Sequence, residues 1–264
     1  MICCRGIMEN KARKGKGMIT AILNQKGGVG KSTTAAAIAA GLRLEGKTTL
    51  LIDLDAQRNL TYTTGAKESP AILETLLNGA DIRDAIQDTQ QGAVIAGCKG
   101  LSGADAYLTQ TGKEYRLKEA LKGLIFDEII IDTPPALGIL TINALTAADR
   151  AIIPAQADVF SIQGIAQLKD TITAVKKYTN PGLIVSGILL TRYNARATLT
   201  RKIDEMAQQL AGTLQTRVYN TRIRENISIK EAQMLQKDIF TYAPKSKAAE
   251  DYKALIEELK GEGK

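Results

Sequence analysis

The chain has 264 residues with a hydrophobic fraction of 44% and an aromatic fraction of 4%, which is typical of one globular α/β domain with an aliphatic core. No apolar run reaches the roughly 20 residues that a membrane-spanning helix requires, and Cys3, Cys4 and Cys98 offer no disulfide framework. These features indicate a cytoplasmic protein, and its formal net charge of +7 comes mainly from two basic segments.

The first basic segment is the N-terminal arm, residues 1–17. It lacks the apolar core of a signal peptide, so we expect it to be a disordered arm in front of one folded domain over residues 18–264. Its charged residues are Glu9 and five cations: Arg5, Lys11, Arg13, Lys14 and Lys16.

The folded domain alternates short, β-branched apolar runs with helical stretches, which predicts a mostly parallel, twisted sheet with helices on both faces. The predicted strands are residues 19–23, 48–52, 128–131, 151–153 and 183–190. The predicted helices are residues 32–44, which end before the C-cap glycine Gly46, then 161–177, 199–210 and 247–260. Residues 54–125 are too mixed to assign. No linker or repeat divides the chain, so we predict a single domain.

A glycine-rich loop follows the first predicted strand. The strict Walker A pattern requires a glycine five residues before Gly30, but Gln25 stands there. Strand, glycine-rich turn and helix still follow one another, so backbone N–H groups and the helix dipole converge on an anion. The pattern therefore predicts a single-domain P-loop NTPase. The residues expected around the ATP phosphates are Lys26, Gly27, Gly28, Val29, Gly30, Lys31, Ser32 and Thr33.

Within this loop we expect Lys31 on the β- and γ-phosphates and the Ser32 hydroxyl on Mg²⁺. Lys26 is an additional cation beside the loop. Two lysines on one set of phosphates would repel each other, so we expect Lys26 to point outward and reach the nucleotide of a second subunit, as an arginine finger does. This arrangement requires a face-to-face dimer closed around two nucleotides.

Acidic residues follow two of the predicted strands. Asp132 comes at the carboxyl end of its strand, where open α/β sheets bind ligands, and is expected to hold Mg²⁺ directly or through water. Asp53 and Asp55 follow another strand. Because residues two apart on a strand share a face, both carboxylates are expected to point toward the phosphates, with Asp53 near Mg²⁺ and one of the two orienting the attacking water. The alternative is that these aspartates only cap a strand end or a turn.

The second basic segment, residues 192–230, is typical of a face that binds a polyanion such as nucleic acid. A solvated basic face without a partner is the alternative. Its cations are Arg192, Arg196, Arg201, Lys202, Arg217, Arg222, Arg224 and Lys230, against Asp204, Glu205 and Glu225.

The C-terminal helix, residues 247–260, has one apolar stripe formed by Tyr252, Leu255, Ile256 and Leu259. From Glu250 onward acidic residues outnumber basic ones, and anionic lipid repels an acidic helix. We therefore expect the stripe to pack on the domain and expect no membrane partner.

Three motifs together resemble the ParA/MinD family of deviant Walker A ATPases, and most closely its small ParA-type partition proteins. They are residues 24–34 with the phosphate loop, residues 51–57 with Asp53 and Asp55, and residues 131–135 with Asp132 and two prolines. The resemblance extends from about residue 18 to the C-terminus.

The resemblance implies an Mg²⁺-dependent ATPase that segregates DNA. It implies that Lys26 crosses the dimer, that Asp55 is needed for hydrolysis, and that ATP-bound sandwich dimers bind double-stranded DNA on the nucleoid without sequence preference. A ParB-like centromere-binding partner then stimulates hydrolysis and releases the dimer. Arg196 matches a DNA-contacting arginine of the family, and Arg192, Arg222 and Arg224 are further candidates.

One departure from the family affects the DNA surface. Where relatives commonly read Pro-Arg-Asn-Val-Arg, this chain has Arg224-Glu225-Asn226-Ile227-Ser228 and loses two basic positions. The alternative function is a MinD-like, membrane-cycling ATPase, whose mark is a basic C-terminal helix. A nitrogenase-iron-protein-like reductase needs two well-placed cysteines per subunit, whereas the domain has only Cys98. An amide ligase of the same fold stays open.

Overall fold

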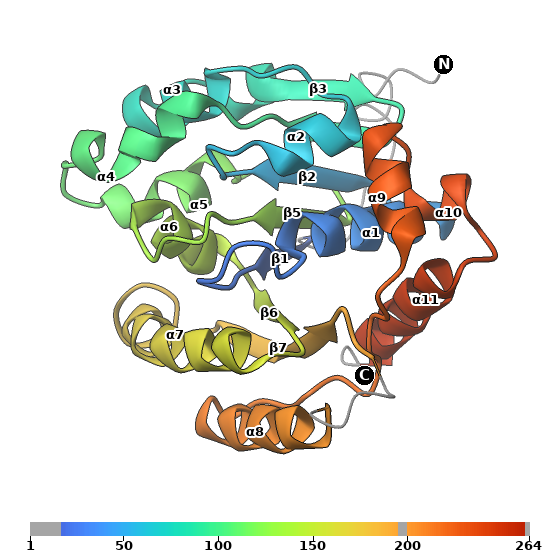
Figure 1. Cartoon of the computed structure of the whole chain (residues 1–264). Coiled ribbons are helices and arrows are strands. Elements are labelled where there is room, and N and C mark those ends of the chain that lie inside the picture. Colours follow the sequence, from blue (N-terminus) through green and yellow to red (C-terminus); the bar gives the residue numbers. More distant parts are fainter. Residues whose placement is uncertain (1–16, 195–199, 262–264) are drawn as a thin grey trace.

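The computed structural model describes residues 17–194 and 200–261. The basic arm expected over residues 1–17 lies, except for Gly17, outside the described residues, and so does Arg196. Strands and helices alternate along much of the chain (Figure 1).

One seven-stranded sheet runs through the described part of the chain in the order β3-β4-β2-β5-β1-β6-β7. Neighbouring strands are parallel except for β3 and β4, which form an antiparallel hairpin at one edge. The strands are β1 (Met18–Ile22), β2 (Thr49–Asp53), β3 (Ile86–Thr89), β4 (Gly92–Ile95), β5 (Glu128–Asp132), β6 (Arg150–Gln156) and β7 (Ile184–Thr191).

Helices cover both faces of this sheet (Figure 1). The α-helices are α1 (Lys31–Leu44), α2 (Asn59–Thr64), α3 (Ala71–Asn78), α4 (Ala104–Tyr107), α5 (Arg116–Ala120), α6 (Ile139–Ala147), α7 (Val159–Tyr178), α8 (Thr200–Thr213), α9 (Ile227–Met234), α10 (Ile239–Tyr242) and α11 (Lys247–Lys260). Short 3₁₀ turns are η2 (Ile82–Ala85), η3 (Lys99–Gly103) and η4 (Lys113–Tyr115).

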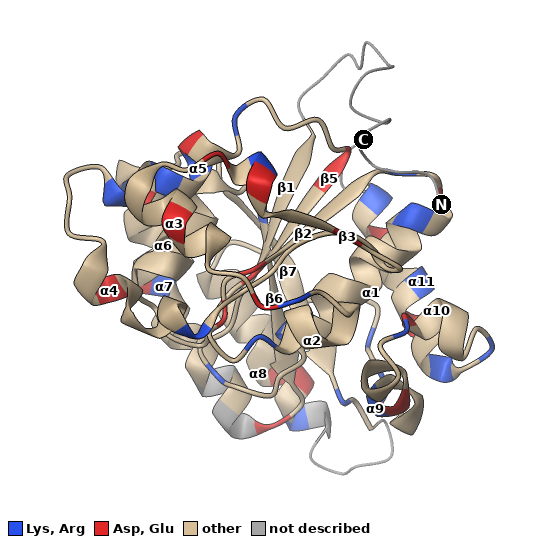
Figure 2. Ribbon diagram, turned by 90° about the horizontal axis from the view of Figure 1, so that it is seen from above, with Lys and Arg blue, Asp and Glu red and all other residues tan. Residues whose placement is uncertain are grey.

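Alternation along the strands divides the aliphatic side chains into two cores. On β5, Ile129 and Ile131 pack with α3, α5, α6, α7 and α8 on one face, whereas Ile130 packs with α1, α9, α10 and α11 on the other. Lys, Arg, Asp and Glu residues accordingly lie mainly on helices and loops, and fewer of them lie on the strands (Figure 2). The predicted two-sided burial of the sheet is therefore confirmed.

All five predicted strands and all four predicted helices are present, with ends that differ by a few residues at most. Glycine ends α1 as expected, since Gly46 follows the C-cap with φ 80°. The unassigned residues 54–125 contain the antiparallel hairpin and several short helices, so the sheet is mostly rather than wholly parallel.

The stripe of the C-terminal helix packs as expected. Tyr252, Leu255, Ile256 and Leu259 of α11 are all buried, and α11 lies against α1 and α10. No helix in the described ranges is long and apolar enough to cross a membrane.

Candidate functional site

The loop between β1 and α1 has the backbone of an anion-binding turn. Gly28 and Gly30 adopt φ of 78° and 93°, a left-handed conformation that glycine takes without steric cost. A Cβ on Gly27 or Gly28 would meet nothing within 4 Å, so the loop is open on its outer side. Gly30 caps α1 without a side-chain hydrogen bond, which leaves the first N–H groups of the helix for a ligand.

A pocket of about 540 Å³ opens in front of this loop, a size typical of small-molecule sites. The phosphate loop from Gly27 to Thr33 lines this pocket, and so do Asp55 and Arg192. The pocket is also lined by residues that were not predicted to bind the nucleotide: Asn59, Tyr62, Thr63, Ile223, Asn226, Ile229, Lys230, Gln233, Met234 and Tyr252. Lys26, Asp53 and Asp132 do not line the pocket.

Lys31 lies at the base of the loop. Its side chain is buried, and its ammonium group lies 3.3 Å from the carbonyl oxygen of Lys26. Burial lowers the pKa of Lys31, while the charges of Asp132 and Asp55 oppose that shift. A buried cation of this kind is stabilised by an anion in the loop, which fits a phosphate group.

Asp132 is the last residue of β5 and is completely buried. Neither of its carboxylate oxygens has a hydrogen-bond partner in the described part of the chain. Burial raises the pKa of Asp132 well above its usual value, and the charge of Asp53 adds to the increase. The Ser32 hydroxyl lowers this pKa from nearby without reaching hydrogen-bond geometry. A buried carboxylate with vacant oxygens beside a hydroxyl fits Mg²⁺ or its coordinated water.

Asp53 differs from Asp132 because its oxygens are already occupied. They accept hydrogen bonds from the Asp55 N–H at 3.0 Å and from the Thr61 N–H and hydroxyl at 2.8 and 2.7 Å. Burial raises its pKa to about 6. Among the residues that the structure covers, no group of three or more His, Cys, Asp and Glu side chains fits a metal ion.

Asp55 lies in a turn after β2 and not, as was expected, on the strand. The expectation that Asp53 and Asp55 share a strand face is wrong, because β2 ends at Asp53. Asp55 lies in the following turn, where its carboxylate accepts the Gln57 N–H at 3.0 Å and its carbonyl accepts the Arg58 N–H at 2.9 Å. Of the two aspartates, only Asp55 lines the pocket.

Lys26 points away from the phosphate pocket. Its ammonium group lies 2.9 Å from both carboxylate oxygens of Asp158, which also caps α7 by accepting the Ser161 N–H at 2.9 Å. Burial alone would raise the pKa of Asp158, but the hydrogen bonds from Lys26 and Ser161 lower it overall. Asp158 was missed at the sequence level, although an aspartate three residues before a serine at a helix start is an N-cap signal.

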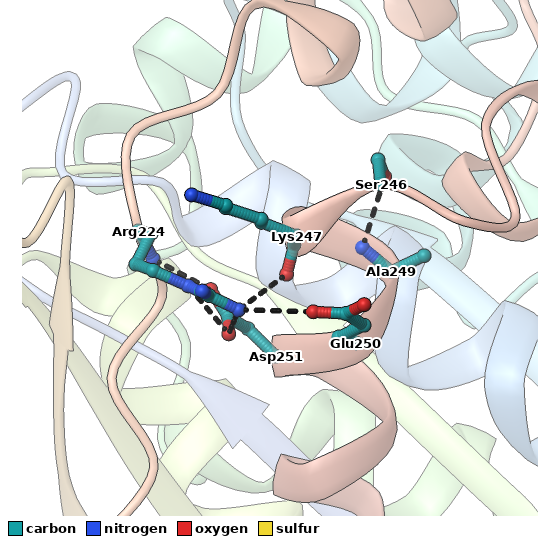
Figure 3. A network of polar contacts seen from close by, with 6 residues as sticks. All are labelled: Arg224, Ser246, Lys247, Ala249, Glu250 and Asp251. Carbon is teal, nitrogen blue, oxygen red and sulfur yellow. Dashed lines mark hydrogen bonds and ion pairs between the residues drawn. The ribbon is translucent and has the colours of Figure 1, made fainter.

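The candidate DNA-binding arginines lie in different surroundings. Arg222 pairs with Asp204 of α8 at 3.1 Å. Arg224 pairs with Asp251 and Glu250 of α11 at 2.6 and 3.3 Å (Figure 3). Both guanidinium groups are therefore engaged within the chain.

The other two candidates differ from this pair. Arg192 is exposed at the mouth of the pocket with φ 48°, and Arg196 is not described. The DNA surface stays a prediction.

Comparison with known proteins gives consistent relatives. A family model described as an AAA domain matches residues 17–185. The chain is 39% identical over 255 residues to the sporulation initiation inhibitor protein Soj of Bacillus subtilis (strain 168), a match that covers 94% of this chain and 100% of Soj.

Two further proteins are similar over nearly the whole chain. Identity to the chromosome partitioning protein ParA of Myxococcus xanthus (strain DK1622) is 39% over 251 residues, 92% of this chain and 88% of that protein. The crystal structure of cobyrinic acid a,c-diamide synthase from Mycobacterium smegmatis with bound ADP and magnesium is 34% identical, with a TM-score of 0.79, over 92% of this chain and 93% of that one.

Proposed function

The chain belongs to the ParA/Soj family of chromosome-partitioning ATPases, and we propose that it hydrolyses ATP with Mg²⁺ to drive the segregation of DNA. The observation that carries this proposal is one pocket lined by an open glycine loop, buried Lys31 and Asp55, with the unpartnered carboxylate of Asp132 buried beside Ser32. These groups supply anion binding, a Mg²⁺ site and a carboxylate for the attacking water.

Each residue then has a distinct role. Backbone N–H groups from Gly27 to Thr33 and the Lys31 ammonium hold the phosphates. They stabilise the negative charge of the phosphoryl group in the transition state. Ser32 and Asp132 would hold Mg²⁺, which would act as a Lewis acid toward the phosphate groups. Asp53 stabilises the residues around this site, since its carboxylate accepts hydrogen bonds from the Asp55 N–H and the Thr61 hydroxyl. Asp55 orients the water that attacks the γ-phosphate.

Dimerisation on ATP is the second part of the proposal. Lys26 does not line the pocket of its own chain, which supports a role at the nucleotide of a partner subunit once Lys26 leaves Asp158. This supports a face-to-face homodimer that forms only when ATP is bound.

Binding of nonspecific double-stranded DNA and of a ParB-like partner completes the cycle. In this proposal the ATP dimer resides on the nucleoid in the cytoplasm, and hydrolysis stimulated by the partner releases it. Support comes from relatives named as partitioning proteins and from the basic segment 192–230. A membrane-cycling role is disfavoured because the apolar stripe of α11 is buried in the domain.

ATP turnover measured alone, with duplex DNA, and with the product of the neighbouring gene tests the proposal. We expect slow basal turnover, stimulation by DNA and partner together, and loss of turnover in Asp55→Ala with ATP binding retained. Lipid binding without DNA binding would favour the MinD-like alternative. Amide formation on a carboxylate substrate would instead favour an amide ligase, and the M. smegmatis protein is named a diamide synthase.

A further inference from the structure

The turn after Asp55 contains a residue in an unusual backbone conformation. Arg58 has φ 60° and ψ 30°, in the left-handed region that residues with a side chain rarely adopt. Its N–H donates to the carbonyl oxygen of Asp55 at 2.9 Å, so this conformation closes the turn that carries Asp55. Backbone strain at such a place persists only where the surroundings hold it.

The side chain of Arg58 provides one such restraint. Its guanidinium group forms an ion pair with Glu68, and its Nε is buried. Glu68 also accepts the N–H of Lys99 at 3.0 Å. Lys99 begins η3, just after β4, so Glu68 ties the Arg58 turn to a loop from the neighbouring strand.

The same two loops are joined a second time on their inner side. The Gly97 N–H donates to the Thr61 hydroxyl at 2.9 Å, and that hydroxyl donates to Asp53 at 2.7 Å. A Cβ on Gly97 would lie 3.0 Å from the carbonyl oxygen of Asp55, so the loops are in close contact. Two sets of contacts therefore hold the turn that carries Asp55: the buried hydrogen bonds of Thr61 and the more exposed Arg58–Glu68 ion pair.

Arg58 itself is not part of the pocket lining, whereas Asp55, Gln57 and Asn59 are. It can influence hydrolysis only through its neighbours. We propose that Arg58 is a positioning residue whose ion pair with Glu68 holds the turn at residues 55–58 and thereby fixes the Asp55 carboxylate toward the nucleotide. The inference rests on the proposed function, because it assigns Asp55 to the hydrolytic step.

The Arg58–Glu68 pair could instead only stabilise the fold, and a glycine substitution distinguishes this role from positioning. Arg58→Gly and Arg58→Ala both remove the pair, but glycine adopts the left-handed conformation without steric cost, whereas alanine, like the native arginine, adopts it only at a cost. Positioning therefore predicts equal losses of turnover with unequal melting temperatures. Stabilisation alone predicts that turnover follows the melting temperature.

The experiment measures kcat and KM for ATP, the Kd of a nonhydrolysable ATP analogue, and Tm. The full-length variants are Arg58→Gly, Arg58→Ala, Arg58→Lys and Glu68→Gln, with Asp55→Ala for comparison. We expect kcat to fall at least about tenfold in Arg58→Gly, Arg58→Ala and Glu68→Gln, with Kd within about twofold of wild type because the phosphate loop is untouched. Arg58→Lys should recover part of kcat, and Arg58→Gly should melt above Arg58→Ala.

Full kcat in Arg58→Gly, or kcat that follows Tm across the series, would overturn the positioning role. If those results came with active wild-type protein and inactive Asp55→Ala, the proposed ATPase function would stand and only this inference would fail. If wild-type protein hydrolysed no ATP with DNA and partner present, both would be overturned.

Discussion

Asp53 and Asp132 are register partners at the ends of the adjacent parallel strands β2 and β5, and both side chains are completely buried. Burial raises both pKa values, that of Asp53 to about 6, and the charge of Asp53 further raises the pKa of Asp132. The nucleotide-free protein thus holds two acids that ionise at a higher pH than an exposed aspartate does.

This pair predicts that nucleotide-free protein loses stability between about pH 4 and pH 7. An unfolded aspartate has a pKa near 3.8 and folded Asp53 one of about 6, so the folded state binds more protons in that range. The stabilisation is complete below pH 3.8 and is lost as the pH rises through 6, at up to about 1.4 kcal/mol per pH unit for each proton. Thermal melting from pH 5 to pH 8 without nucleotide measures it.

Asp132→Asn should raise Tm at pH 7.5 without nucleotide, because a neutral amide replaces a buried carboxylate. It should also reduce the extra stabilisation that Mg²⁺ gives to ATP-bound protein. Asp88→Asn, at an exposed position on β3, is the control and should change neither value. A lower Tm for Asp132→Asn at pH 7.5 would show that the carboxylate has a stabilising partner instead.

The Lys26–Asp158 pair predicts opposite effects of two substitutions on dimerisation. Lys26→Gln should bind ATP but fail to dimerise or hydrolyse it, because the cation that reaches the partner is lost. Asp158→Asn keeps an N-cap for α7 but removes the carboxylate that holds Lys26, so ATP-dependent dimers should form at lower protein concentration. Sedimentation velocity with a nonhydrolysable ATP analogue measures both, and full dimerisation of Lys26→Gln would retire the trans role.

Much of the fold follows from local sequence, because strands β1, β2, β5, β6 and β7 are apolar runs that pattern alone identifies. The edge hairpin does not, since β3 contains Gln87, Asp88 and Thr89 and is only partly buried. Helices α2, α4 and α5 have six, four and five residues, too few to show a helical period. Residues 54–125 were unassigned for these reasons.

The site divides in the same way. The phosphate loop and Asp132 could be predicted because each is marked by a short local pattern. The loop combines glycines with a lysine, and Asp132 is an acid at the end of an apolar strand. The pocket residues of α9 could not be predicted, because only the folded chain brings them to the phosphate loop. The Gln233 side chain, for example, donates a 2.8 Å hydrogen bond to the hydroxyl of Thr33, which lies 200 positions earlier. Asp158 was missed because only the fold brings it to Lys26.

Close packing of Gly97 predicts a catalytic defect from a single methyl group. A Cβ there would lie 3.0 and 3.1 Å from the carbonyl oxygens of Asp55 and Asp53, so Gly97→Ala should shift the Asp55 turn. We expect kcat to fall, and stability to fall by about 1–3 kcal/mol, with nucleotide affinity little changed. Gly212→Ala in α8 meets nothing within 4 Å and should stabilise the protein slightly, as helical glycine replacements do.

The paired arginines predict which cations contact DNA. Arg224 donates to Asp251 through its side chain and its backbone N–H, and it also reaches Glu250 (Figure 3). Arg224→Ala leaves the buried Asp251 carboxylate short of partners, so it should lower Tm and change DNA affinity little. Arg196→Ala should instead leave Tm unchanged, weaken duplex binding and reduce the slope of log affinity against log salt by about one. Affinity for ATP-bound protein at several salt concentrations, with Tm for each variant, distinguishes the two. The opposite result is an unchanged slope in Arg196→Ala and a reduced slope in Arg224→Ala. It would show that Arg224 contacts DNA, which requires Arg224 to leave Asp251.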